Sequence, residues 1–379
     1  MSDLNVCGRT AKSLIRFDTS GPPAKELPLA KWIKDYLEDI GAQVDLQIVE
    51  TDRANVIGKI GEGKAPGLLL SGHIDVVLAG EPSLWNVTTP FEPKVKDGKL
   101  YGRGSCDMKG PDACILNACK KLSKESFKRQ LTVAFTAGED TGGWYVTRVL
   151  SENKVTKKEA IFGIIPEPSM MEIVRNHKGG GGAKVLVHGK AAHSSQPELG
   201  VNAIMKSSDF LHELKKHQKR LQRKPNEFLG PTTMECTLIH GGFKANIIPD
   251  RCLLTINMRL IPGHENPEMI KGWLNDIIKK CKQKDPEFKA EFLDVSASPP
   301  LNVPEDSEVV MLLKSILRKE PIGVPYYTEA VSYTRAGIPT VICGPGSIDQ
   351  AHTPDEYITL KQLDFGVKIF KEAIKRVCL

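Results

Sequence analysis

The sequence predicts an α/β protein of two parts: a domain built on a mixed, mostly parallel sheet flanked by helices, and a second domain inserted into it. Over the first 177 residues, short apolar runs alternate with stretches of helical spacing, which is typical of a parallel sheet covered by helices. From residue 178 the order becomes βαββαβ, and a proline-containing segment at 298–304 leads back to the first domain. We therefore expect domain segments 1–177, 178–295 and 296–379, with the middle one inserted.

The composition bounds the class of protein. The chain has 379 residues, of which 40% are hydrophobic, so it is long enough for two or three domains with a real core. Its formal charge of +6 is small for this length and its basic residues are scattered, which argues against a nucleic-acid partner. A mild positive charge is compatible with a small anionic substrate.

The cysteines and the N-terminus indicate a cytoplasmic protein. The nine cysteines are odd in number and dispersed, and they form no CxxC pair, so we expect reduced thiols. Residues 1–5 carry no targeting signal, and no apolar run approaches the length of a membrane span. A membrane partner is therefore not expected.

In the first domain, two N-terminal helices are predicted over 4–16 and 26–41, and the second ends at Gly41. Strands are predicted where apolar residues alternate or form short runs between turn residues. These strands are 43–49, 55–60, a run beginning at 66, 130–137, 160–165 and 340–343, and further helices are 113–122 and 308–318. The connection 78–99 is long for an α/β unit, so we expect it to form a wall or lid over a site.

The segment 68–77 is an apolar run that ends in Ser71-Gly72 and then presents His73 and Asp75, as a buried strand does at a functional edge of a sheet. Residues two apart in an extended chain point the same way. Asp75 could therefore accept the second imidazole N–H of His73 and leave the other ring nitrogen free for a metal. The alternative is a capped strand end with a satisfied histidine, and this segment alone does not decide between them.

Ionisable residues follow the other predicted strands and turns at equivalent positions. They are Asp107 before a helix, Glu139 and Asp140 after one strand, Glu167 after the next, and His352 on the loop after a fifth. Individually, Asp107 could be a helix N-cap, and Glu139 and Asp140 could be acids favoured by a helix dipole. Adjacent carboxylates there are nevertheless costly unless they are paired or metal-bound. Because ligands of open α/β sheets bind beyond the carboxyl ends of the strands, the repetition indicates a binding site.

The inserted domain has its own sequence of elements. The four glycines 179–182 are expected to form a hinge. Then follow strand 183–188, helix 201–221, strands 233–239 and 252–259, helix 267–281 and strand 288–295. The βαββαβ order is that of a ferredoxin-like domain.

The residue types at the predicted site favour metal chemistry. Two histidines with several carboxylates and no cysteine suit a catalytic pair of Zn²⁺ ions, with Co²⁺ or Mn²⁺ as alternatives, because a structural zinc usually has four closed ligands that include sulfur. Two metals about 3.5–4 Å apart need one bridging carboxylate. Such a pair lowers the pKa of a bridging water, polarises a carbonyl and leaves one carboxylate as general base.

Five motifs in order resemble one known family. They are Gly72-His73-Ile74-Asp75, the segment 102–110, Glu139-Asp140, Glu167 and the segment 351–356. Together they are similar to the di-zinc deacylase and metallopeptidase family, which includes acetylornithine deacetylase, succinyl-diaminopimelate desuccinylase, aminoacylase and the glutamate-releasing carboxypeptidases. The resemblance spans nearly the whole chain, and it implies a lid and dimerisation domain for residues 178–295.

The resemblance implies two metal sites that share a bridging aspartate. Their ligands are His73, Asp107 and Glu167 for one metal, and Asp107, Asp140 and His352 for the other. Glu139 is implied as the general base and Asp75 as the residue that orients His73. The family's usual Asp-Glu-Glu run reads Gly-Glu-Asp here. Because Asp140 is one methylene shorter than glutamate, we expect the second metal to be held differently or more weakly.

Three residues of the insertion are implied in binding. The segment 189–197 resembles one whose histidine reaches the active site of a dimer partner, which implies a homodimer in which His193 stabilises the oxyanion in trans. The spacing alone supports only a loop histidine. Asn246 and Arg259 match substrate-contacting positions, and Arg259 could pair with a substrate carboxylate. The alternative for Arg259 is a surface arginine at a strand end.

Within the family, the segments 106–110, 327–330 and 343–356 are most similar to acetylornithine deacetylase. This implies metal-dependent hydrolysis of N²-acetylornithine to ornithine and acetate in arginine biosynthesis, with Gly344 and Glu329 as substrate-binding residues. Glu329 could meet the substrate ammonium or be a surface carboxylate. Rival reactions are succinyl-diaminopimelate desuccinylation, general acylamino-acid hydrolysis and dipeptide hydrolysis. An inactive metal-binding dimer is disfavoured, because it would have little use for an acid such as Glu139.

Overall fold

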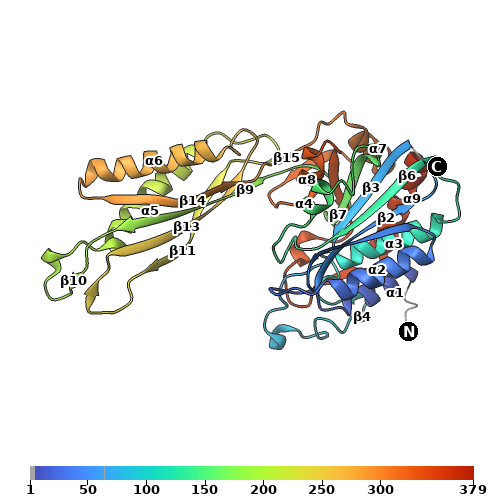
Figure 1. Ribbon diagram of the computed structural model, residues 1–379, viewed down its shortest axis with the longest axis horizontal. Helices are drawn as coiled ribbons and strands as arrows, with labels where there is room; N and C mark the ends of the chain where they lie inside the picture. The colour runs from blue at the N-terminus through green and yellow to red at the C-terminus, as the bar shows by residue number, and fades with distance from the viewer. Residues whose placement is uncertain (1–4, 64) are drawn as a thin grey trace. The chain divides into compact units, whose positions relative to one another are not determined.

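The structure is a computed structural model that describes residues 5–63 and 65–379 (Figure 1). The start of the first predicted helix and most of residues 1–5, in which no targeting signal is expected, lie outside these residues. The chain divides into two compact units. The first comprises residues up to Arg175, Val303–Ile322 and Thr328–Leu379, and the second comprises Asn176–Asn302 and Gly323–Tyr327. The second unit thus includes residues that we expected in the last segment, 296–379.

A mixed sheet forms the centre of the first unit, with the strand order β1-β2-β6-β3-β7-β17-β8. Its strands are β1 (Gln43–Glu50), β2 (Arg53–Ile60), β3 (Ala65–His73), β6 (Arg129–Thr136), β7 (Ala160–Pro168), β8 (Ile173–His177) and β17 (Thr340–Gly344). Strands β6, β3, β7 and β17 are parallel, and Leu69 of β3 pairs with both Thr132 and Gly163. The predicted mixed, mostly parallel sheet is confirmed, and its parallel strands end at one edge.

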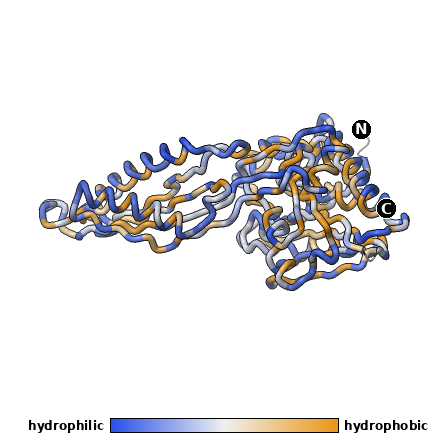
Figure 2. The backbone as a smooth tube through the Cα atoms, turned by 90° about the horizontal axis from the view of Figure 1, so that it is seen from above, coloured by the Kyte–Doolittle hydropathy of each residue, from blue (hydrophilic) through white to orange (hydrophobic). Residues whose placement is uncertain are grey.

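Helices cover both faces of this sheet. They are α1 (Val6–Ile15), α2 (Leu27–Asp39), α3 (Lys109–Leu122), α4 (Val146–Ser151), α7 (Glu308–Leu317), α8 (Ala330–Arg335) and α9 (Leu360–Cys378). Gly72 of β3 faces Asp112 of α3, whereas the Ser71 hydroxyl bonds that of Tyr333 in α8 at 3.0 Å. Because successive strand residues point to opposite faces, α3 and α8 lie on opposite sides. Figure 2 shows hydrophobic residues concentrated in the interior of this unit.

A small sheet joins the long connection 78–99 to the segment that carries His352. Its elements are β4 (Lys94–Lys96), β5 (Lys99–Tyr101) and β18 (Tyr357–Thr359), in the order β18-β5-β4, and the connection also contains the short helix η1 (Pro82–Leu84). The carboxylate of Asp355 accepts hydrogen bonds of 3.0 Å from the amides of Asn86 and Val87. The connection is therefore anchored at Asn86 and Val87 and at its β4–β5 end.

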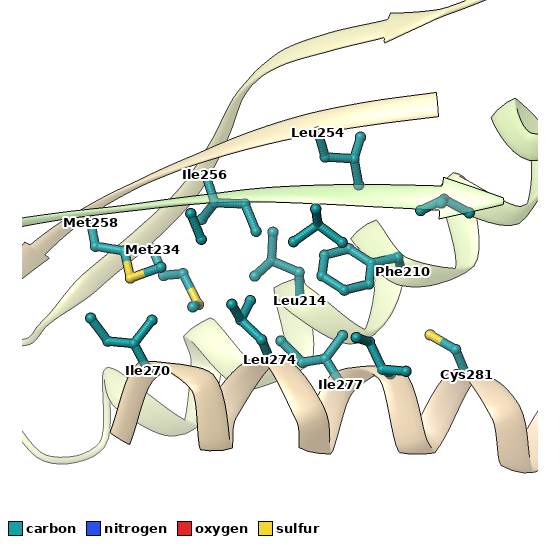
Figure 3. Close-up of a cluster of buried hydrophobic side chains, with 14 of the residues drawn as sticks. Phe210, Leu214, Met234, Leu254, Ile256, Met258, Ile270, Leu274, Ile277 and Cys281 are labelled. Atoms are coloured by element: carbon teal, nitrogen blue, oxygen red, sulfur yellow. The ribbon is translucent and has the colours of Figure 1, made fainter. Parts of the chain in front are cut away.

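The second unit is an antiparallel sheet with two helices, and its strand order is β11-β13-β9-β14. Its elements are β9 (Gly179–His188), β10 (Ala192–His193), η2 (Pro197–Leu199), α5 (Ala203–Leu221), β11 (Thr233–Gly241), β12 (Ile247–Ile248), β13 (Arg251–Leu260), α6 (Pro267–Lys284), β14 (Lys289–Ala297) and β15 (Leu301–Asn302), while β16 (Pro321–Val324) ends in it. Phe210, Leu214 and Ile277 belong to the core between helices and sheet (Figure 3). This arrangement is ferredoxin-like, as predicted.

The four glycines that we expected to form a hinge are part of a strand. Gly182 of β9 pairs with Asn257 of β13 on one side and with Ser296 of β14 on the other. A Cβ at Gly179 would lie 2.3 Å from the carbonyl oxygen of Ser298, so glycine allows two backbones to approach closely. The hinge prediction is therefore wrong. In the described part of the chain, no helix is long and apolar enough to cross a membrane.

Candidate metal centre

His73 ends β3 and turns its ring toward two carboxylates. The side chain is buried, and Nε2 lies 3.2 Å from Asp107 Oδ1 and 3.6 Å from Glu167 Oε1. Nδ1 lies 3.0 Å from the main-chain carbonyl oxygen of Asp75, to which it can donate. This hydrogen bond selects the tautomer in which Nε2 offers its lone pair to a metal.

Asp75 contacts the ring mainly through its main chain and not, as predicted, through its carboxylate. The carboxylate accepts hydrogen bonds of 2.8–3.1 Å from four successive amides and one hydroxyl of residues 138–141. Its Oδ1 remains 3.6 Å from His73 Nδ1. A buried carboxylate needs such donors. Asp75 therefore fixes the loop that carries Glu139 and Asp140.

Asp107 lies between two imidazole rings. Its Oδ1 is 3.2 Å from Nε2 of His73, and its Oδ2 is 3.2 Å from Nε2 of His352. Burial alone would raise the pKa of Asp107, but the hydrogen bonds with His352 and His73 hold it below its ordinary value. One carboxylate thus presents an oxygen to each of two neighbouring clusters, as a bridging ligand does.

The second cluster joins Asp107 to Asp140 and His352. His352 follows the short helix η3 (Ile348–Gln350), its side chain is 52% exposed, and its Nε2 lies 3.3 Å from Asp140 Oδ1. Hydrogen bonds with Asp107 and Asp140 raise the pKa of His352 to about 10. The other oxygen of Asp140 is buried without a hydrogen-bond partner. A bound cation would balance this concentration of carboxylate oxygens.

Glu139 lies beside the two clusters but belongs to neither predicted ligand set. One of its carboxylate oxygens lies within 4.8 Å of ligand atoms of His73 and Asp140. Burial raises the pKa of Glu139 well above its ordinary value; His73 opposes this effect, and Glu167 and Asp140 add to it. A carboxyl group in this position can hold a proton without being a metal ligand.

The two predicted ligand sets fit divalent metal ions. They are His73 with Asp107 and Glu167, and Asp107 with Asp140 and His352, and within each the ligand atoms lie within 4.8 Å of one another. Ligand atoms about 2.0–2.2 Å from a tetrahedral zinc ion lie about 3.3–3.6 Å apart. The four nitrogen–oxygen separations of 3.2–3.6 Å agree with this geometry. Imidazole and carboxylate donors are suited to zinc, cobalt or manganese.

Two buried polar residues of β2 support the loop after β6, and the sequence did not indicate them. Arg53 donates hydrogen bonds of 2.9 Å to the carboxylate of Glu26 and to the carbonyl oxygen of Gly142. Asn55 accepts one of 2.8 Å from the amide of Ala137. The partners lie 27 to 89 residues away in the chain. No local sequence signal could therefore reveal these contacts.

Of the predicted binding residues of the insertion, His193 and Asn246 lie close together outside β13, whereas Arg259 lies near the end of that strand. His193, on β10, lies close to Asn246, whose main-chain oxygen accepts a hydrogen bond of 3.1 Å from the Ser194 amide. Asn246 precedes β13, whereas Arg259 is exposed near the end of β13. The eight residue steps from Arg251 to Arg259 span about 27 Å at about 3.4 Å per residue. The second unit of a single chain therefore does not bring His193 and Arg259 together.

Glu329 and Gly344 are both buried in the first unit. Glu329 is 2% exposed, which excludes the surface alternative, and it accepts a hydrogen bond of 2.6 Å from Thr136 Oγ1. Burial raises the pKa of Glu329 to about 8. The Gly344 amide donates to Ser169 Oγ at 3.0 Å, and a Cβ at Gly344 would lie 2.0 Å from the carbonyl oxygen of Pro166. Strand packing explains this glycine, so the expected contact with substrate gains no support.

The fold and the clusters together define a class of protein: an α/β unit with a paired histidine–carboxylate centre at the carboxyl edge of its sheet, interrupted in sequence by a ferredoxin-like unit. The sequence pattern of Peptidase family M20/M25/M40 matches residues 69–376. The chain belongs to this family of hydrolases. The resemblance stated from the motifs is thereby confirmed.

Three known proteins illustrate the likeness. Acetylornithine deacetylase from Photorhabdus laumondii is 33% identical over 356 residues, which cover 93% of this chain and 89% of the relative. The structure of a tripeptidase from Staphylococcus aureus is similar with a TM-score of 0.77 and 22% identity, covering 98% of this chain and 97% of that one. A dinuclear metal binding peptidase of the M20 family from Bacillus subtilis has a TM-score of 0.67 and 18% identity, covering 97% and 96%.

Proposed function

We propose that the chain is a two-metal amide hydrolase that removes the acetyl group of N²-acetylornithine, giving ornithine and acetate for arginine biosynthesis in the cytoplasm. The observation that carries this proposal is the pair of three-residue clusters that share Asp107 at the carboxyl edge of the sheet. The 33% identity to a relative named acetylornithine deacetylase supports the choice of substrate.

The five candidate ligands would hold two zinc ions, with cobalt or manganese as alternatives. When bound, the two ions supply a water of lowered pKa and a polarised substrate carbonyl. Asp107 would contact both ions, because its two oxygens face different clusters. Asp140 is shorter than glutamate by one methylene, so we expect the ion that it contacts to be the more weakly held.

Glu139 is the residue that we expect to move the proton. Its carboxylate would take a proton from the attacking water and pass it to the leaving amine nitrogen, a role that requires a group outside the ligand sets. Asp75 accepts a hydrogen bond of 3.1 Å from the Glu139 amide. It thereby fixes the main chain from which this carboxylate projects.

A second copy of the chain is the proposed partner, through the second unit. β11 is at the edge of its sheet, and its Leu238 and Ile239 are 54% and 51% exposed. An exposed apolar edge strand is a surface on which another chain can pair. Because His193 pairs with Ile247, before β13 begins, and Arg259 lies about 27 Å along that strand from Arg251, we expect the two to contact one small substrate only from different copies. This supports a role for His193 at the oxyanion of the partner's site.

Arg259 and Asn246 are the remaining proposed substrate contacts. Arg259 is exposed and would pair with the substrate carboxylate, a contact that its planar guanidinium favours. Asn246 would contact the substrate from the same copy as His193, because the two lie together in the second unit.

A panel of amide substrates tests the proposal. The purified chain, stripped by a chelator and reloaded with Zn²⁺ or Co²⁺, should hydrolyse N²-acetylornithine with the highest kcat/KM of the panel. N-succinyl-diaminopimelate, a neutral acetylamino acid and a dipeptide serve as competitors. A higher kcat/KM for one of them would replace the proposed substrate, and no hydrolysis of any amide with two metals bound would contradict the proposed activity.

A further inference from the structure

Glu356 is a fully buried carboxylate outside both ligand clusters, and it bonds the loop that precedes α3. Its Oε1 accepts hydrogen bonds from the amides of Cys106 and Asp107 at 2.7 and 3.0 Å. Its Oε2 accepts from the Gly104 amide at 2.9 Å and from Arg103 Nη1 at 2.8 Å. Four donors from one loop thus converge on a single carboxylate.

These hydrogen bonds stand in place of secondary structure that the loop lacks. Residues 104–107 lie between β5 and α3 and belong to neither, and Gly104 has a φ of 82°. Buried main-chain amides need acceptors, and a hydrogen bond to an ionised carboxylate is stronger than one to a neutral oxygen. Glu356 therefore determines the path of the main chain from which the Asp107 side chain projects.

The segment that contains Glu356 also supplies a candidate metal ligand. His352, four residues earlier, is a candidate ligand of the second cluster. Asp355 anchors the connection 78–99 through two main-chain amides. The segment 352–356 thus supplies one ligand directly, and it fixes the backbone of the ligand that both clusters share.

We propose that Glu356 is a positioning residue that holds Asp107 between the two metal ions and so controls the affinity of both. The proposal rests on the proposed function, in which Asp107 bridges two metals. A carboxylate that only stabilised the fold would change the free energy of unfolding but not the spacing of the ligands. Metal affinity therefore separates the two roles.

Glu356→Gln tests the proposal, because glutamine has nearly the same shape but only one acceptor oxygen. Whichever way the amide turns, its NH₂ group faces donors: the amides of Cys106 and Asp107, or the Gly104 amide and Arg103. We expect the affinity of the stripped protein for both Zn²⁺ ions to fall about 10- to 100-fold in calorimetric titrations. The visible spectrum of the Co²⁺-loaded protein should change as well.

Glu213→Gln is the matched control. Glu213 is also a buried carboxylate, bonded to Lys216 at 2.9 Å, but it lies in the second unit. This variant should lower the free energy of unfolding and leave both metal affinities unchanged. Wild-type affinities in the Glu356 variant, or an equal loss of affinity in the control, would overturn the proposal.

Two further measurements apply if Glu356→Gln does not fold. Glu356→Asp keeps the charge opposite Arg103 but withdraws the carboxylate by one methylene, so it should also weaken both metals, and unchanged affinities would count against the proposal. In the wild type, the amide hydrogens of residues 104, 106 and 107 should be protected from exchange, whereas rapid exchange would contradict the proposal.

A wild-type chain that binds fewer than two metals would contradict the proposed function itself. A two-metal wild type with an unaffected variant would contradict only the role of Glu356.

Discussion

The two units present their candidate functional residues in different ways. In the first unit, residues from separate strand ends and loops meet within 4.8 Å, and buried carboxylates such as Asp75 hold the loops that carry them. In the second, His193 and Arg259 are exposed, and they lie near opposite ends of β13, which spans about 27 Å from Arg251 to Arg259. The comparison indicates that one copy brings the candidate metal ligands together but keeps His193 and Arg259 apart.

Glu139→Gln should lower the catalytic rate more than any other variant, and it tests whether the first unit supplies the general base. Glutamine cannot carry the proton, so we expect kcat to fall about 10²- to 10⁴-fold. Both metals should remain bound, because Glu139 is in neither predicted ligand set. Steady-state kinetics and metal analysis check this, with the exposed Glu62→Gln of the same unit as control. Loss of a metal together with activity would make Glu139 a ligand and not a base.

His193→Ala tests whether the second unit supplies an oxyanion donor to the site of a partner chain. Removal of an oxyanion donor should lower kcat about 10²- to 10³-fold. If the histidine acts in trans, mixing this variant with Glu139→Gln and allowing subunits to exchange should restore activity, because each mixed dimer contains one site with both residues intact. The measurement is the rate before and after mixing. No recovery in a preparation shown to contain mixed dimers would place His193 in its own chain's site.

Asp140→Ala tests the second of the two candidate ligand clusters. The variant should lose one metal per chain and most of its activity, while His73, Asp107 and Glu167 keep the other ion. Asp140→Glu, which restores the usual length of this side chain, should retain both. Metal content after dialysis distinguishes the outcomes. An alanine variant with two metals and the wild-type rate would refute this ligand assignment.

The smallest expected effect concerns the stability of the second unit in acid. Burial lowers the pKa of His217 in α5 to about 4, with help from Arg220 and Lys280, whereas the ordinary value is 6.5. The unfolded chain therefore binds this proton first, so the free energy of unfolding should fall as the pH drops from about 6.5 to about 4. His217→Gln should flatten this dependence in urea unfolding, and the exposed His212→Gln should not. Equal acid sensitivity in both variants would count against the effect.

The candidate residues of the metal centre could be predicted from the sequence because each follows a local signal. His73, Glu139 and Glu167 come at or just after short apolar runs that end in turn residues. The parallel topology then brings those ends to one edge. The βαββαβ order of the second unit was predictable for the same reason, since it depends on the periodicity of each element.

The supporting contacts could not be predicted, because they join residues that are far apart in the chain. Asp75 bonds a loop 63 to 66 residues later, and Glu356 bonds one 249 to 252 residues earlier. The glycines 179–182 of β9 were wrongly predicted to form a hinge for a related reason, because their strand partners are distant in the sequence. Whether such a run bends or pairs depends on β13 and β14, which lie far along the sequence.

Because the Asp75 carboxylate accepts hydrogen bonds from four consecutive amides, the number of residues in the turn 138–141 is constrained during evolution. An extra residue between 138 and 141 would shift the register of these amides and carry Glu139 or Asp140 out of reach of its neighbours. Insertions should therefore be tolerated in surface loops such as 222–225, whose residues are exposed, but not here. The length of this turn must therefore be preserved together with the side chains of Glu139 and Asp140.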